Sequence, residues 1–124
     1  MCIRDSSYSA DVLIHEAQAN HMINLIREFR LQSGDKLGAK LLEDITTYHT
    51  TPVEAARVAN LAEVKHLIFY HLTPAPRNTL TERIFLRGVD EVREDWTLSN
   101  DGTMVVLPVE SDEIILSELD NDYE

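Results

Sequence analysis

The chain has 124 residues, 44% of them hydrophobic and 27% charged, and carries a formal net charge of −11 at pH 7. This length accommodates one domain with a sizeable core and excludes two ordinary ones. The acidic balance repels phosphate backbones and so argues against a nucleic-acid-binding module. No apolar run reaches the ~20 residues of a membrane span, and the first residues lack a signal-peptide pattern. We therefore expect a soluble, globular protein of the cytoplasm with no membrane partner.

Both ends of the chain are predicted to lie outside the folded part. Residues 1–9 show no hydrophobic periodicity and are expected to be disordered, and residues 1–6 resemble a translated sequencing-adaptor leader rather than natural protein. The single cysteine, Cys2, excludes an internal disulfide. Residues 10–124 are expected to form the one domain. Its end is interpreted as a frayed acidic tail that contains Glu110, Asp112, Glu113, Glu118, Asp120, Asp122 and Glu124.

The first half of the domain predicts one strand and two helical stretches. The short apolar run 10–14 ends at His15-Glu16-Ala17 and favours a buried strand. Apolar residues at three- and four-residue spacing then predict a helix over 18–30 and a second over 37–48. Ser33-Gly34-Asp35 between them is a stop signal, so the two stretches form either one broken helix or a helix pair.

The middle of the chain predicts a helix followed by a strand. Thr51 is a candidate N-cap, Pro52 suits the first helical position, and Glu54 lies three residues after the cap, as a capping box requires. The helix is expected to run to Ala62. The continuous apolar run 67–70 then suits a strand covered on both faces. Strand, helix and strand in this order predict a parallel, right-handed crossover.

The last third predicts a loop, a helix and a β-hairpin. A proline-stiffened loop over 72–78 precedes a second capping-box pattern at 79–82, which opens a helix to Val89. Residues 96–98 and 103–107 are predicted to pair as a hairpin around the turn 100–102. A further short strand is predicted at 114–116. The whole pattern indicates an α/β fold.

Histidines occupy the positions from which chemistry is expected. His15 and His71 follow predicted strands, and His49 immediately precedes the capped helix. Sites in open α/β sheets lie at the carboxyl ends of parallel strands, so we expect His15, Glu16, His49 and His71 to meet at one edge. The chemical interpretation is a metal-assisted hydrolase. His71 binds a divalent metal, Glu16 orients His49, and His49 donates a proton to the leaving group.

Structural interpretations stand beside these roles. No two histidines have the local spacing of a metal site, and a histidine at a strand end is commonly a hydrogen-bonded structural residue. Glu16 also suits the first turn of a helix, where a carboxylate complements the dipole. Arg77 either holds an anionic substrate or is an exposed loop arginine, and His21 and His66 are interpreted as surface or packing residues. The alternative to a hydrolase is a non-catalytic α/β binding or scaffold module.

Three segments in order resemble the carboxy-terminal motifs of the metallo-β-lactamase fold, and most of all its ribonuclease Z and arylsulfatase-like branch. They are residues 11–18 with His15-Glu16-Ala17, residues 48–56 with His49-Thr50-Thr51, and residues 69–74 with His71. Gln18 and Thr50 stand where the family motifs have threonine and serine. The resemblance covers residues 10 to about 107 and implies the carboxy-terminal half of an αββα sandwich.

The resemblance also implies a function. His71 corresponds to the last zinc ligand, His49 to the histidine that protonates the leaving group, and Glu16 to its acidic relay partner. The expected cofactor is a divalent metal of the zinc type, dinuclear in the complete protein, and the substrate is a phosphodiester, including RNA-type ones, or a sulfate-type ester. The H-x-H-x-D-H motif is not found in this sequence. We therefore expect a carboxy-terminal part, inactive alone, with an uncovered sheet face; a homodimer is compatible with it.

Overall fold

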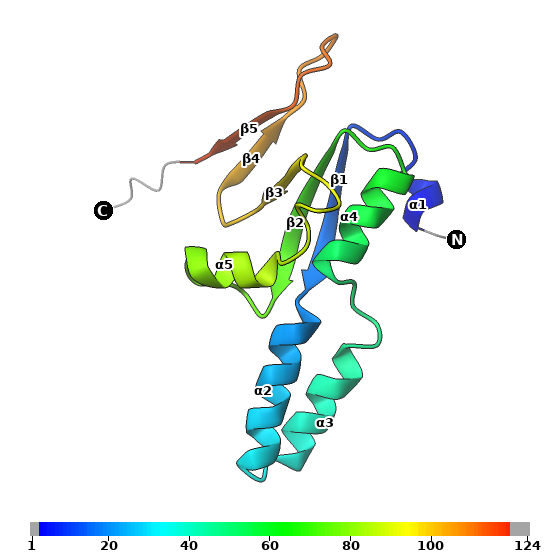
Figure 1. The fold of residues 1–124 in the computed structure, drawn as a ribbon. Helices are drawn as coiled ribbons and strands as arrows, with labels where there is room; N and C mark the ends of the chain where they lie inside the picture. The colour runs from blue at the N-terminus through cyan, green and yellow to red at the C-terminus, as the bar shows by residue number, and fades with distance from the viewer. Residues whose placement is uncertain (1–2, 120–124) are drawn as a thin grey trace.

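The computed structural model describes residues 3–119 and contains two separate sheets with helices around the larger one (Figure 1). The predicted α/β class is confirmed. The elements in chain order are α1 (Ile3–Ser6), β1 (Val12–Gln18), α2 (Asn20–Gln32), α3 (Lys36–Ile45), α4 (Pro52–Leu61), β2 (His66–Thr73), α5 (Thr79–Phe85), β3 (Trp96–Leu98), β4 (Thr103–Val106) and β5 (Ile115–Glu118).

The larger sheet has three parallel strands in the order β1-β2-β3. Strands β1 and β2 begin side by side, with Val12 opposite His66, and the chain between them passes through α2, α3 and α4. Parallel neighbours need such a crossover connection because the chain must return to the same end of the sheet. The predicted parallel pairing is confirmed, and it places the carboxyl ends of β1 and β2 at one edge.

Strand β1 runs further than the sequence predicts. The expected end at His15 is wrong, because the ladder with β2 continues to Gln18 opposite Thr73. The polar residues there are enclosed: His15 is 7% exposed and Gln18 is fully buried. The polar residues that suggested a strand end therefore belong to a buried strand, in which His15 Nδ1 and the Gln18 side-chain nitrogen have hydrogen-bond partners and Gln18 Oε1 has none among the described residues.

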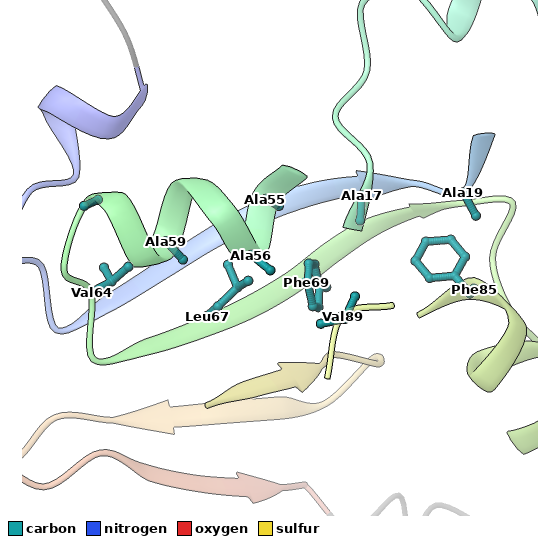
Figure 2. Close-up of a cluster of buried hydrophobic side chains, with 11 residues drawn as sticks. Ala17, Ala19, Ala55, Ala56, Ala59, Val64, Leu67, Phe69, Phe85 and Val89 are labelled. Atoms are coloured by element: carbon teal, nitrogen blue, oxygen red, sulfur yellow. The ribbon is translucent and has the colours of Figure 1, made fainter. Parts of the chain in front are cut away.

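Helix α4 covers one face of this sheet with small side chains (Figure 2). The fully buried alanines of this helix let its backbone approach β1 and β2 closely, and larger side chains such as Phe69 and Phe85 fill the remaining space. On the opposite face, Ile14 and Tyr70 are 57% and 50% exposed. The expectation that β2 is covered on both faces therefore holds for its first half only.

The start of α4 is formed as predicted, whereas the start of α5 is not. Thr51 accepts a hydrogen bond from the Glu54 backbone, and Glu54 bonds back to Thr51, which completes the capping box. In α5 the cap is Asn78, whose side chain accepts from the Thr81 backbone. The predicted box at 79–82 was one residue late, because Asn accepts at an N-cap as well as Thr does. Helix α5 also ends at Phe85, before Val89.

Helices α2 and α3 form a pair that lies side by side and extends away from the sheet (Figure 1). Of the two alternatives left by the sequence, one broken helix or a helix pair, the structure has the helix pair. Asp35 begins α3 by accepting a hydrogen bond from the Gly38 backbone. Few of their apolar residues reach the core. Those that remain exposed include Leu25, Phe29, Leu37 and Leu41.

The predicted hairpin between 96–98 and 103–107 is wrong. Strand β3 instead joins β2 in parallel, and β4 pairs antiparallel with β5. The open edge of β2 supplies backbone partners for β3, and the Trp96 ring packs beside Phe69 at a centroid distance of 6.1 Å. The short strand predicted at 114–116 is confirmed as β5, and a carboxy-terminal hairpin is present with this different pairing.

The two chain ends are described only in part. Within the range expected to be disordered, α1 is helical and the Ser9 backbone donates to the Ala62 carbonyl. Residues 1–2, with Cys2, lie outside the described residues. The acidic tail is described to residue 119, and Asp120, Asp122 and Glu124 lie beyond it. From residue 3 to residue 119, no helix has the length and apolar character needed to cross a membrane.

Candidate active site at the carboxyl ends of β1 and β2

Glu16 and His49 form a hydrogen-bonded pair between β1 and the loop before α4. His49 Nδ1 donates to Glu16 Oε2 at 2.5 Å, and each side chain is 23% exposed. Because a carboxylate only accepts, this bond fixes a proton on Nδ1. The other ring nitrogen, Nε2, has no hydrogen-bond partner among residues 3–119. A substrate oxygen could therefore bind to Nε2.

The second oxygen of Glu16 holds the loop that carries His49. Thr50 donates its backbone N–H to Glu16 Oε1 at 3.0 Å, so one carboxylate positions both the ring and its backbone. Partial burial by itself raises the pKa of Glu16. The hydrogen bonds from His49 and Thr50, with the nearby charge of His49 and His15, outweigh burial and bring the pKa below its ordinary value. Glu16 is thus held as a carboxylate.

This shift gives the stability of the protein a predictable pH dependence. The folded state releases the Glu16 proton more readily than the unfolded state does, because the pKa of Glu16 is lower in the folded protein. The contribution of Glu16 to the free energy of unfolding is therefore complete above the ordinary glutamate pKa, and it is lost as the pH falls through the lower pKa of the folded state. We expect Glu16→Gln to destabilise the fold by about 1–2 kcal/mol at neutral pH. Urea unfolding at successively lower pH should show this difference shrinking.

The control is Glu28→Gln, which changes an exposed glutamate on α2. It should leave the pH profile of stability as in the wild-type protein. A difference between wild type and Glu16→Gln that stays constant down to strongly acidic pH would contradict the role assigned to the ionised carboxylate.

His71 is an extra residue in β2, a feature that the sequence analysis did not foresee. Glu16 lies opposite Tyr70 and Ala17 lies opposite Leu72, so His71 has no partner residue in β1. Its backbone has φ 46°, in the left-handed region that side chains other than glycine rarely adopt. A bulge of this kind redirects a side chain. Leu72 thereby packs into the core, and His71 is left beside Glu16.

Because of the positive φ at His71, we expect glycine to be more stabilising than alanine at this position, the reverse of the usual order in a strand. An L-residue in the left-handed region costs about 1 kcal/mol, which glycine does not incur. We expect His71→Gly to be more stable than His71→Ala by about 1 kcal/mol in denaturant unfolding. The same pair at Tyr70, in ordinary strand conformation, should give the opposite order. Equal or reversed stabilities at His71 would contradict the bulge.

The imidazole of His71 lies near the pair. Its Nδ1 is 4.0 Å from Glu16 Oε2, its ring centroid is 6.2 Å from that of His49, and its side chain is 64% exposed. Among residues 3–119, no three histidine, cysteine, aspartate or glutamate side chains converge into a group that could hold a metal ion. A catalytic zinc takes about three protein ligands. His71 offers one donor, so residues 3–119 do not by themselves group the ligands of a complete metal site.

The remaining predicted residues lie elsewhere or play structural parts. His15 is buried, and its Nδ1 donates to the Glu16 carbonyl at 2.7 Å. Arg77 is exposed, and its backbone N–H donates to the Thr81 hydroxyl. His21 Nε2 donates to the Ile84 carbonyl and so joins α2 to the end of α5. The structure therefore groups Glu16, His49 and His71, and the prediction for Arg77 gains no support from it.

His66, interpreted from the sequence as a surface or packing residue, lies at the start of β2. Its Nε2 hydrogen-bonds with the Thr97 hydroxyl at 2.9 Å. Partial burial lowers the pKa of His66 below its ordinary value. This histidine joins β2 to β3 at the end of the strand away from Glu16 and His49.

Gln18 is a structural part of the site to which no role was assigned from the sequence. Its backbone N–H donates to the Thr50 carbonyl at 2.8 Å, and its side-chain amide donates to Asn20 Oδ1 and the Ile45 carbonyl. These bonds hold the end of β1 against the loop with His49. The signal available was a glutamine at the start of the helix predicted over 18–30, and a glutamine at such a position does not identify a buried strand residue.

Comparison with known proteins adds no family assignment: no family model matches this chain, and no curated protein matches it either.

Proposed function

We propose that this chain is the carboxy-terminal part of a metal-dependent hydrolase that cleaves phosphodiester or sulfate-type esters. In this proposal His49 is the general acid, Glu16 positions it, and His71 contributes one ligand to a metal of the zinc type. Most of the metal ligands come from outside this chain. The proposal extends the resemblance of residues 10 to about 107 to the metallo-β-lactamase fold.

One observation carries the proposal: the Glu16–His49 pair leaves an available Nε2 next to a histidine presented by a strand bulge. A carboxylate that holds one imidazole nitrogen and leaves the other for the reacting group is a recurrent arrangement for proton transfer. The positive φ of His71 supports a functional role, because such strain persists where the surrounding structure maintains it.

The described residues account for the leaving-group half of the reaction. Hydrolysis adds the hydroxyl of water to phosphorus or sulfur and a proton to the leaving oxygen. His49 in its doubly protonated form donates the Nε2 proton as the bond to the leaving oxygen breaks, and the proton released by the attacking water restores that form. Glu16 remains ionised and holds Nδ1 throughout, so the ring does not turn when the proton is transferred.

The test uses the protein from the complete reading frame, in which the upstream sequence should contain H-x-H-x-D-H. We expect it to bind zinc with defined stoichiometry in a calorimetric titration and to hydrolyse bis(p-nitrophenyl) phosphate or p-nitrophenyl sulfate. His71→Ala should weaken zinc binding, while His66→Ala, at the far end of the same strand, should leave it intact. Absence of zinc binding, or unchanged binding by His71→Ala, refutes the proposal.

A further inference from the structure

A groove of about 570 Å³ opens beside His71. It lies between the segment that follows β2 and the turn that joins β3 to β4. Apolar and aromatic surface comes from Tyr70 and Pro76, and polar surface comes from Ser99, Asn100 and Asp101. His71 is the one predicted site residue among those described that lines it, so the groove is a surface separate from the Glu16–His49 pair.

The groove is continuous with the candidate site through two residues. His71 lies next to Glu16 on one side and lines the groove on the other. Tyr70 lines the groove and also a smaller depression that contains Glu16 and Tyr48. A substrate whose reacting bond lies at His49 can therefore extend one of its two substituents into the groove.

Two polar side chains that line the groove, Ser99 and Asn100, are already engaged in hydrogen bonds. The Ser99 hydroxyl donates to the Phe69 carbonyl at 2.7 Å. Asn100 donates its side-chain amide to Glu118 and accepts from the Thr103 hydroxyl. These side chains stabilise the walls, and their donors are not available to an anionic ligand.

Asp101 differs from Ser99 and Asn100, its two neighbours in the turn between β3 and β4. Its carboxylate is exposed at the tip of the β3–β4 turn and has no hydrogen-bond or ion-pair partner within residues 3–119. Within the part of the chain that the structure describes, no lysine or arginine lines the groove. A carboxylate attracts hydrogen-bond donors and cations and repels phosphate and carboxylate groups. The groove therefore matches an apolar body that carries a donor, and it opposes a second anionic group.

We propose that the groove binds the leaving alcohol of the substrate, and that this alcohol is an aryl or alkyl group bearing an ammonium or hydroxyl donor directed at Asp101. This inference rests on the proposed function, in which the leaving oxygen receives its proton from His49. Phosphorus or sulfur gains the hydroxyl of water, the bond to the leaving oxygen breaks, and that oxygen takes the His49 proton. The proton that the water releases restores His49, and the alcohol departs through the groove. A nucleotide leaving group, which carries further phosphates, is disfavoured by the same charge.

The first test measures binding without any reaction. Titration of para-(aminomethyl)phenol into the isotopically labelled protein should shift amide signals of residues 70–72 and 99–101, and para-hydroxybenzoate should bind at least about fivefold more weakly. Asp101→Asn should remove this preference. Asp112→Asn changes a fully solvated acid that pairs with Lys65 and should leave it unchanged. Equal binding of the two phenols, or shifts outside the groove, overturns the inference.

The second test separates the inference from the proposed function. The complete protein should hydrolyse methyl phosphodiesters of the two phenols with a kcat/KM ratio of about five- to tenfold in favour of the aminomethyl ester. Binding with the expected preference but no hydrolysis would leave the groove assignment standing and refute the proposed function. Hydrolysis that depends on His49 without a charge preference would refute the groove assignment alone.

Discussion

If the proposed function holds, replacing His49 by alanine in the protein from the complete reading frame is expected to lower kcat by about 10²–10⁴-fold for esters of weakly acidic alcohols. The same variant should lose much less activity on p-nitrophenyl esters, because p-nitrophenolate leaves without a proton. This dependence on the leaving group distinguishes a general acid from a residue that only binds substrate. It follows from the free Nε2 of a ring whose Nδ1 is held by Glu16. Steady-state rates over a series of leaving groups measure it.

Two further variants make the result decisive. Glu16→Gln should show the same trend with a smaller loss, because the ring is retained and only its positioning is weakened. His21→Ala removes an exposed histidine whose role is a bond to the Ile84 carbonyl, and it should leave kcat unchanged. An equal loss for all leaving groups in the His49 variant would contradict the assignment of His49 as proton donor.

Replacing Phe69 by alanine is expected to destabilise the fold by about 3–5 kcal/mol. Phe69 is fully buried on the central strand, between the alanine-rich face of α4 and the Trp96 ring (Figure 2). The space left by its ring cannot be filled by the small side chains of α4. Because a domain of this size is only marginally stable, a loss of this size leaves little folded protein. Denaturant unfolding followed by circular dichroism measures the change.

The neighbouring residue provides the matched control. Tyr70 is also aromatic and follows Phe69 in the same strand, but its side chain is half-exposed on the other face. Tyr70→Ala should cost about 1 kcal/mol or less. Comparable losses for the two variants would mean that the exposed face of β2 is covered in solution, for example by a second copy or by the rest of a longer chain.

Local sequence signals predicted the elements that depend on neighbours in the chain. The capping box at Thr51 and Glu54 needs only residues three positions apart, and it is formed as expected. The apolar run of β2 and the helical spacing before it identified the elements, and their order identified the parallel pairing. These features are determined by side-chain periodicity and turn chemistry within a few residues.

Features that depend on pairing between distant segments were missed or wrong. The bulge at His71 exists only in relation to β1, so no pattern within β2 indicates it. The partner predicted for β3 was wrong. A glycine turn followed by an apolar run is compatible with a hairpin, but β3 pairs instead with the open edge of β2. The grouping of Glu16, His49 and His71 was expected from strand order, while the positions of their atoms depend on the bulge and on Gln18.

The α2–α3 helix pair is joined to the rest of the molecule at its base. Gln18 and Thr50, which flank the pair in the chain, are bonded to each other, and Gln18 also holds the Ile45 carbonyl. These bonds hold the two ends of the segment between Gln18 and Thr50 together, so the positions of the ends do not depend on the length of the helix pair. Insertions, deletions or a proteolytic cut at the Ser33-Gly34 tip should be tolerated. Evolution can thus alter this helix pair, including its exposed apolar surface, without displacing the loop that carries His49.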